Sequence, residues 1–314
     1  MQKKNHLHNK YVIQKNELLY GDTSLFTIDD LKIFRLVISK VNSQNLLFED
    51  FYEITNDELK DLKLKESHLY QNTLTSLKKL ANIYVPLEVK GEDGKVTSIK
   101  EVGLIQNNFE FKKYSRKFYV SFHKDLKKYL LQIKGGFTKY PIIEITDLDF
   151  KYSLKLYEYL RSTNLTVMKV GIEKLKKRLD VKSASYSVYG NFNNKILKAA
   201  INQINNSKTC NMHVECEPIK DGRKIIQVQF RITRNGVLTG FKKKENTYNL
   251  DLIKLQKYEN KIIVMEDQSY IINEVNIDTI SITIANKENK NDVMEKKFGS
   301  IDDMEKELKS LNYE

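Results

Sequence analysis

The chain has 314 residues, of which 40% are apolar and 30% charged, and its formal net charge is +12. This composition excludes collagen-like and wholly disordered chains, and the length predicts about two domains. No apolar run approaches the roughly 18 residues that a membrane span requires, and no apolar stretch follows the charged N-terminus. We therefore expect a cytoplasmic protein without a membrane partner.

The basic excess is confined to residues 1–240, which hold 41 Lys and Arg against 26 Asp and Glu. Residues 241–314 hold 12 basic residues against 15 acidic ones. A polyanionic partner is therefore expected to bind the first 240 residues. Nucleic acid is the usual partner of such a chain, although charge alone does not distinguish it from an anionic membrane surface.

Residues 1–134 are predicted to form an N-terminal domain. Thr27 and Asp30 have the spacing of a capping box, and apolar residues follow them at helical spacing. A second box begins at Thr55 and leads to a helix predicted over residues 67–80, which completes a helix-turn-helix. The side of this helix that faces the core is predicted to be Tyr70, Leu74, Leu77 and Leu80. The outward side chains are His68, Gln71, Asn72, Thr75 and Lys79, and of these His68, Gln71, Asn72 and Lys79 are candidates for contact with nucleic acid.

A β-hairpin follows this helix in the predicted order of elements. Residues 84–89 and 96–104 have strand character and flank a turn that contains Gly91 and Gly94. A further strand is predicted over residues 118–122 and a helix over residues 124–133. A helix, a helix-turn-helix and then a hairpin predict a winged helix whose wing is the 84–104 hairpin.

The same order of elements is repeated over residues 135–237. A helix over residues 150–161 precedes a short strand over 166–170 and a small helix over 172–179. A long helix is predicted over residues 185–206, with Phe192, Ile196, Ala200, Ile201 and Ile204 on its inner side. A hairpin follows, in which Asp221 and Gly222 form the turn and the inward residues are Val214, Cys216, Pro218, Ile226, Val228, Phe230 and Ile232. The sequence therefore predicts an α+β protein with two tandem winged-helix domains.

Residues 238–314 are predicted to form a linker and a small C-terminal accessory module. The charged run over residues 241–246 has the character of a linker. Strands are expected near residues 261–265, 270–275 and 279–285, and an acidic helix over residues 301–311. Cys210 and Cys216 precede this region and are expected to be plain thiols, because both could lie on one strand and two ligands are too few for zinc.

Three segments of the chain resemble the iteron-binding plasmid replication initiators of the Rep type. The first segment is residues 11–18. The second is residues 137–141 with the block over residues 152–160, and the third is residues 192–205 with the turn over residues 222–225. Together they span roughly residues 10–235. The resemblance implies two winged helices that bind directly repeated origin DNA as monomers and repress their own promoter as dimers. It also implies opening of an adjacent A·T-rich region and recruitment of the host replication initiator and the replicative helicase. The family often carries arginines after the phenylalanine of the long helix, where this chain has Asn193, Asn194 and Lys195.

The resemblance implies that the long helix of the second domain enters a major groove of double-stranded DNA, which is wide enough for a helix. An Asn side chain can make a bidentate contact with adenine, so Asn191 or Asn194 could read A·T pairs, while Lys195 and Lys198 are better placed for phosphates. The alternative is an ordinary solvated helix face. The full set of candidates in this domain is Lys182, Ser183, Tyr186, Tyr189, Asn191, Asn193, Asn194, Lys195, Lys198 and, at the tip of the wing, Arg223.

Catalytic interpretations find little support in the sequence. His6 and His8 match the His-x-His pattern of rolling-circle nicking enzymes, but they lie in a charged terminus that we expect to be frayed. Asp147 and Asp149 superficially resemble the paired metal-binding carboxylates of a polymerase or primase. They precede a helix, however, where capping is the expected role of a carboxylate. Residues 91–95 lack the spacing of a phosphate-binding loop. We therefore expect no catalytic residue, no metal and no cofactor, and keep a rolling-circle nicking enzyme and a winged-helix transcriptional repressor as alternatives.

Overall fold

A computed structural model describes the chain except for residues 1–4, 65–66, 92–94, 113–115, 235–254, 256–257, 259–260, 266–267, 277–280, 289–291 and 314. The predicted linker over residues 241–246 and most of the predicted turn after Gly91 lie outside the described residues. The chain divides into two compact units, Met1–Arg234 and Asn235–Glu314. Among the helices that the structure describes, none combines the length and the apolar character that crossing a bilayer requires.

The first winged helix is built on the two predicted capping boxes. Thr27 Oγ1 accepts a hydrogen bond from the Asp30 N–H at 3.2 Å, and the Thr27 N–H donates to the Asp30 carboxylate at 2.8 Å. Thr55 and Glu58 exchange the same pair of bonds. Both boxes are therefore confirmed. The elements of this winged helix are α2 (Ile28–Ile38), β2 (Tyr52–Thr55), α3 (Asn56–Asp61), α4 (Leu69–Asn82), β5 (Glu110–Lys112) and β6 (Lys117–Val120).

The wing of this domain is not the hairpin that the sequence predicted. Strands β3 (Tyr84–Lys90) and β4 (Val96–Gly103) form a separate two-stranded sheet. The three-stranded sheet of the winged helix has the order β2-β6-β5, so the β5–β6 hairpin occupies the wing position. The prediction was wrong because β3 and β4 are longer and more apolar than β5, which has only three residues and no buried side chain.

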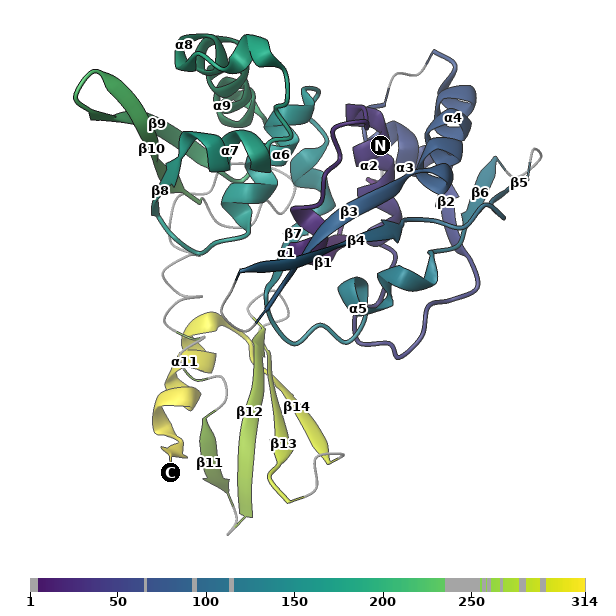
Figure 1. Cartoon of the computed structure of the whole chain (residues 1–314). Helices are drawn as coiled ribbons and strands as arrows, with labels where there is room; N and C mark the ends of the chain where they lie inside the picture. The colour runs from purple at the N-terminus through teal and green to yellow at the C-terminus, as the bar shows by residue number, and fades with distance from the viewer. Residues whose placement is uncertain are drawn as a thin grey trace. The chain divides into compact units, whose positions relative to one another are not determined.

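The second winged helix repeats this topology with the strand order β8-β10-β9 (Figure 1). In both domains the strand between the first and second helices pairs with the last strand of the wing. The tandem duplication predicted from the sequence is therefore present. Its elements are α6 (Lys151–Arg161), β8 (Val167–Gly171), α7 (Ile172–Arg178), η3 (Ala184–Tyr186), α8 (Tyr189–Phe192), η4 (Asn193–Leu197), α9 (Lys198–Asn206), β9 (His213–Asp221) and β10 (Lys224–Thr233).

Several shorter elements join the two winged helices. Strand β1 (Tyr11–Lys15) pairs antiparallel with β7 (Phe137–Pro141), so residues far apart in the chain, such as Gln14 and Thr138, are brought side by side in one sheet. Neither strand was predicted. The helix expected over residues 124–133 is shorter, because α5 ends at Leu130. The remaining elements are α1 (Asn16–Leu19), η1 (Lys124–Leu126), α5 (Lys127–Leu130) and η2 (Ile142–Ile145).

A single core runs through both winged helices and contains buried charges at its centre. Glu158 of α6 accepts hydrogen bonds from Arg35 Nε at 2.6 Å, from Arg35 Nη2 at 3.1 Å and from the Tyr140 hydroxyl at 2.5 Å. Burial alone would lower the pKa of Arg35, but the charge of Glu158 raises it above its ordinary value. Arg35 therefore stays charged and holds α2 against α6.

Three residues that the sequence assigned to the core of the first unit are exposed. Tyr70 is 43% exposed rather than part of the core, because the inner side of α4 is formed by Leu69, Thr73, Ser76, Leu77 and Leu80. In the second wing, Pro218 and Ile226 are exposed, since the outer half of the hairpin extends beyond the core. A register shift between Ile225 and Gln227 also interrupts the alternation there.

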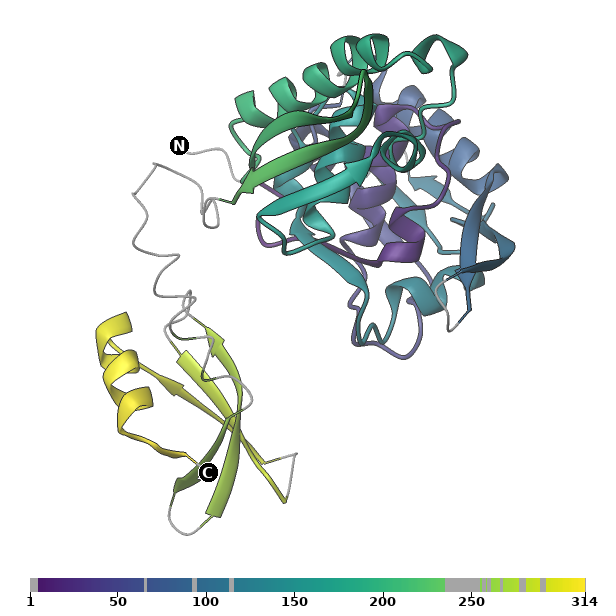
Figure 2. The ribbon, with the colours of Figure 1, turned by 60° about the vertical axis from the view of Figure 1, so that its left-hand side comes forward.

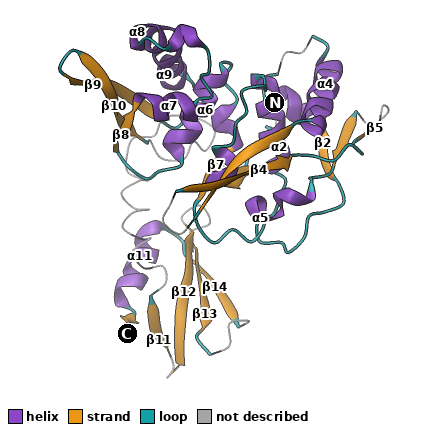
Figure 3. Cartoon of the chain, viewed as in Figure 1, coloured by secondary structure: helices purple, strands orange, loops and turns teal. Residues whose placement is uncertain are grey.

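The described residues of the second unit form a five-stranded antiparallel sheet and a helix with their own core, and the strand order is β14-β13-β12-β11-β15 (Figure 3). Ser300 caps its helix by accepting a hydrogen bond from the Asp303 N–H. Strands β14 and β15 were not predicted, because every side chain of β14 is exposed and β15 has two residues. The bounds are β11 (Ile262–Met265), β12 (Gln268–Asn276), β13 (Ser281–Asn286), β14 (Val293–Lys297), α11 (Ile301–Ser310) and β15 (Asn312–Tyr313).

Substitution of Arg35 tests the contribution of the buried ion pair. Arg35→Met should lower the free energy of unfolding by about 3–5 kcal/mol, because it leaves Glu158 buried without its charged partner. Arg231 is a matched control, since it pairs with Glu217 at 3.3 Å on the surface. Arg231→Met should change the free energy by less than about 1 kcal/mol. Urea denaturation of the full chain measures both, and similar losses in the two variants would contradict the assignment.

Candidate nucleic-acid interface

The long helix of the second winged helix runs without a break from Tyr189 to Asn206, through α8, η4 and α9. Its start at residue 185 was wrongly predicted, because residues 184–186 form the separate 3-10 turn η3, which Ser183 caps. The segment η4 is a π-helical turn, so the backbone is locally wider than an α-helix. The helix lies beside the β9–β10 hairpin (Figure 2). It buries Phe192, Ile196, Leu197, Ala200, Ile201 and Ile204 against the core.

The opposite face of this helix presents three of the predicted side chains to solvent. Asn194, Lys195 and Lys198 are exposed, and no described residue forms a hydrogen bond or ion pair with their side chains. Asn191 is also exposed, but its amide Nδ2 donates to the Ser185 carbonyl at 3.1 Å. Asn193 is half-buried and accepts from the Tyr189 hydroxyl at 3.4 Å. The face therefore offers one side-chain amide and two ammonium groups that are exposed and have no partner among the described residues.

The turn before the helix is fixed by contacts with α6 and with the segment between α1 and α2. The buried carboxylate of Asp180 accepts hydrogen bonds from Lys155 Nζ at 2.5 Å and from Thr23 Oγ1 at 2.8 Å. Lys182 is exposed and forms an ion pair with Asp22. Burial opposes the ionisation of Asp22, but the hydrogen bond from Lys182 lowers its pKa below the ordinary value. Tyr186 is half-buried against the core, so of the residues predicted in this turn only Lys182 and Ser183 are exposed.

The wing of the second domain carries cations around its turn. The hairpin projects from the body of the unit (Figure 1). Gly222 has φ +56° at the turn, where a residue with a Cβ would be strained. Lys220, Arg223 and Lys224 are all exposed beside it. The tip therefore presents three exposed cations, the type of side chain that contacts phosphates.

The corresponding helix of the first winged helix is α4, and three of its four candidates are exposed there. His68 lies at its N-terminus with φ +61°, and Gln71 follows one turn later. Asn72 is exposed, with its amide donating to the Ser67 carbonyl at 3.2 Å. Lys79 does not face outward as expected, because it is ion-paired at 2.9 Å with the buried Asp30.

The sequence-based candidates omitted the wing of the first domain. Lys112 and Lys117 lie on β5 and β6, and Arg116 lies between these strands with φ +52°. Lys117 is paired with Glu53 at 2.9 Å, and Lys112 lies over the Tyr119 ring at 4.7 Å. Four basic residues within residues 112–117 were a usable signal. They were overlooked because the wing had been assigned to the wrong hairpin.

The residues considered for metal chemistry make other contacts. Residues 5–10 are not frayed, because Leu7 is buried and His6 Nδ1 lies 3.0 Å from the Asp61 carboxylate. His6 and His8 lie in a turn rather than on a strand. No group of three His, Cys, Asp or Glu side chains that could hold a metal occurs among the residues described.

The two acidic residues before α6 do not cap it. The N-cap is Phe150, without a capping side chain, and its N–H donates to Gln203 Oε1 at 3.1 Å. Asp147 instead accepts hydrogen bonds from Lys63 and from the Lys208 N–H, and Asp149 pairs with the buried Lys32 at 3.2 Å. These carboxylates therefore connect the segment before α6 to Lys63, Lys208 and Lys32.

Both cysteines are free thiols, as expected. Burial raises the pKa of the Cys210 thiol to about 12 and that of Cys216 also to about 12. Neither thiol is therefore ionised near neutral pH, and neither has the reactivity of a catalytic thiolate.

Two family models match the chain over its first unit. The model described as "Initiator Replication protein, WH1" matches residues 11–161, and the model described as "Initiator Rep protein, WH2" matches residues 171–232. Among solved structures, the crystal structure of the Pi initiator protein in complex with iteron DNA matches with a TM-score of 0.60 and 17% sequence identity. The match covers 72% of this chain and 98% of that chain, and at this identity it establishes the fold. No curated protein matches significantly.

Two glycines of the interface provide a matched test of its backbone. Gly222→Ala should lower the free energy of unfolding by about 1–2 kcal/mol, because its φ is left-handed. Gly190 lies in α8, and a Cβ added there would meet nothing within 4 Å, so Gly190→Ala should stabilise the chain by about 0.5 kcal/mol. Chemical denaturation measures both changes. A loss of the same size in the two variants would contradict the turn geometry.

Proposed function

The chain belongs to the family of initiator replication proteins, and from this membership we propose that it initiates plasmid replication by binding directly repeated double-stranded origin DNA. The observation that carries the proposal is the open face formed by Asn194, Lys195 and Lys198 on the long helix of a winged helix. A major groove about 12 Å wide admits such a helix. The structural neighbour Pi, which has the same fold over nearly its whole length, was solved in complex with iteron DNA.

The side chains suggest a division of roles at the DNA. Asn194 can make a bidentate contact with adenine, so it is the candidate for base reading. Lys195 and Lys198 can neutralise phosphates on the flanking strands. Arg223 at the second wing and Arg116 at the first are candidates for further phosphate contacts. Because phosphate contacts are independent of sequence, we assign specificity to the amide and general affinity to the cations.

Both winged helices are proposed to act on one DNA site. The Arg35–Glu158 ion pair and the Asp180 cluster fix the second domain against the first. Two helices that reach grooves about one duplex turn apart require a repeat of roughly 20 base pairs. His68, Gln71 and Asn72 of α4 are the candidates for contact in the first domain.

Further activities are proposed from the family resemblance alone. These are dimerisation with repression of the protein's own promoter, opening of an A·T-rich region, recruitment of the host replication initiator and the replicative helicase, and action in the cytoplasm. We also propose that the chain has no catalytic activity and requires no cofactor. The position of His6 and His8 in an exposed turn supports the absence of catalysis, because the paired histidines of a nicking enzyme lie on a core strand.

The proposed function predicts that the gene and its adjacent repeats suffice to maintain a plasmid. A reporter plasmid that carries only these elements should replicate in a host that supplies the general replication machinery. Plasmid copy number measures the result, with a plasmid that lacks the repeats as the control. Repression of the promoter without maintenance of the plasmid would favour a transcriptional repressor.

Substitution of two neighbouring side chains separates base reading from phosphate binding. Asn194→Ala should cost on the order of 1–3 kcal/mol at one base-pair position and relax specificity there. Lys198→Ala should weaken binding to all sequences alike and reduce the slope of log affinity against log salt by about 1. Equilibrium binding to the repeat, to single-base variants and to random duplex measures these effects. Equal losses on all of these duplexes for Asn194→Ala would remove its reading role.

Incubation with supercoiled origin plasmid and Mn²⁺ tests the absence of catalysis. The wild-type chain should leave the plasmid supercoiled. The paired variant His6→Ala with His8→Ala should behave in the same way, and a purified nicking enzyme serves as the positive control. A nicked product that disappears in the variant would establish the rolling-circle alternative.

A further inference from the structure

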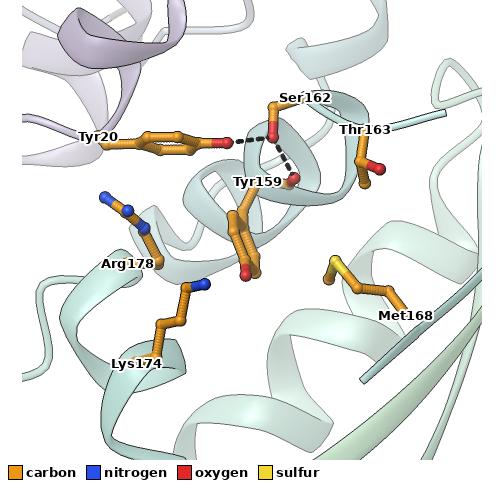
Figure 4. Close-up of a pocket in the computed structure, with 7 residues that line it drawn as sticks. All are labelled: Tyr20, Tyr159, Ser162, Thr163, Met168, Lys174 and Arg178. Carbon is orange, nitrogen blue, oxygen red and sulfur yellow. Dashed lines mark hydrogen bonds between the residues drawn. The ribbon is translucent and has the colours of Figure 1, made fainter. Parts of the chain in front are cut away.

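A pocket of about 280 Å³ lies where the segment after α1 meets α6 and α7 of the second winged helix (Figure 4). Tyr20 comes from the residue after α1, whereas Lys174 and Arg178 come from α7. The volume is close to the lower end of the range of about 300–1,000 Å³ for ligand pockets, which occur preferentially at domain interfaces. The complete lining is Tyr20, Tyr159, Ser162, Thr163, Met168, Lys174 and Arg178.

Hydrogen bonds and ring contacts order this pocket. Ser162 Oγ donates to the Tyr159 carbonyl at 2.7 Å, so the Tyr20 hydroxyl must donate to Ser162 Oγ, at 2.6 Å. The Tyr20 and Tyr159 rings meet edge to face at 6.0 Å. The guanidinium carbon of Arg178 lies 4.0 Å from the centroid of the Tyr20 ring. These contacts hold Tyr20 and Arg178 in place, so a ligand would not have to order them.

The charge of the pocket is positive and uncompensated by its own walls. Lys174 and Arg178 are four residues apart on α7 and therefore lie on the same face of the helix. The other two lysines of α7 are engaged elsewhere, Lys176 with Glu173 and Lys177 with Glu88. No carboxylate occurs in the lining given by the described residues. A buried or half-buried anion is the ligand that this arrangement favours.

The DNA interface does not account for these residues. None of the seven belongs to α8, η4, α9 or the two wings, which carry the candidates for groove and phosphate contact. The apolar rings of Tyr20 and Tyr159 and the thioether of Met168 also differ from the exposed polar face of the long helix. The pocket thus combines an apolar wall with paired cations, as a site for a small organic anion requires.

We propose that this pocket binds a small phosphate monoester with a flat apolar body, as in a nucleoside monophosphate. The phosphate lies between Lys174 and Arg178, whose guanidinium offers a planar set of donors and whose neighbour supplies a compact charge. The apolar body packs against Tyr159 and Met168. The bound ligand bridges Tyr20, in the segment after α1, and α7 of the second winged helix. This inference does not depend on DNA binding.

Calorimetric titration of the full chain with adenosine monophosphate tests the proposal. Binding should be saturable with one site per chain, and adenosine and inorganic phosphate should each bind more weakly than the monoester. Lys174→Gln should weaken binding on the order of tenfold, because it removes a charge-assisted hydrogen bond. Lys177 lies on the same helix but does not line the pocket. Lys177→Gln removes the same charge and should leave binding unchanged. The melting temperature should rise with adenosine monophosphate in the wild type and in Lys177→Gln.

Several results would overturn the proposal, and they are separable from failure of DNA binding. Equal binding of adenosine and adenosine monophosphate would show that no phosphate is recognised. Equal losses in Lys174→Gln and Lys177→Gln would show attraction to general positive charge. If the monoester does not bind and Lys174→Gln weakens binding to a random duplex as Lys198→Ala does, the pocket is a contact for the DNA backbone. Lys174 is exposed, so its substitution should not prevent folding.

Discussion

The ion pair between Arg35 and Glu158 joins the first helix of one winged helix to the first helix of the other inside a continuous core. A charge removed from water is tolerated only where a partner and further hydrogen bonds satisfy it. Arg35, Glu158 and Tyr140 satisfy one another only when α2, α6 and β7 have this arrangement. The network therefore favours one orientation of the two domains over others that would bury the same apolar area.

The second buried cluster extends this constraint to the functional surface. Lys155 and Thr23 both bind the carboxylate of Asp180, which follows α7 and begins the turn that leads to the long helix. The turn that leads to Asn194, Lys195 and Lys198 is thus joined through Asp180 to Thr23, in the segment between α1 and α2. The pocket at Tyr20 and α7 lies on the same boundary between the domains. A ligand there would contact both domains on which this orientation depends.

The errors in the sequence analysis have two physical causes. A wing is recognised by its pairing partners, and pairing between β2 and β6 joins residues more than 60 positions apart, such as Ile54 and Phe118. The longer β3–β4 hairpin gave the stronger local signal and was taken for the wing. Lys79, Asp147 and Asp149 were judged by their local position alone. Their partners, Asp30, Lys63 and Lys32, lie at least 49 residues away in the chain.

The sequence alone determined the two capping boxes, the helical periodicity, the repeated order of elements and the concentration of positive charge in the first 240 residues. These features are local or compositional, so short stretches of chain contain the whole signal. It also placed Asn194, Lys195 and Lys198 on an outward face, because that face is opposite the apolar residues of the same helix. Only the tertiary structure decided which hairpin is the wing, which lysines are paired and how the two domains are oriented. Those properties depend on contacts between residues distant in sequence, whose partners no local pattern specifies.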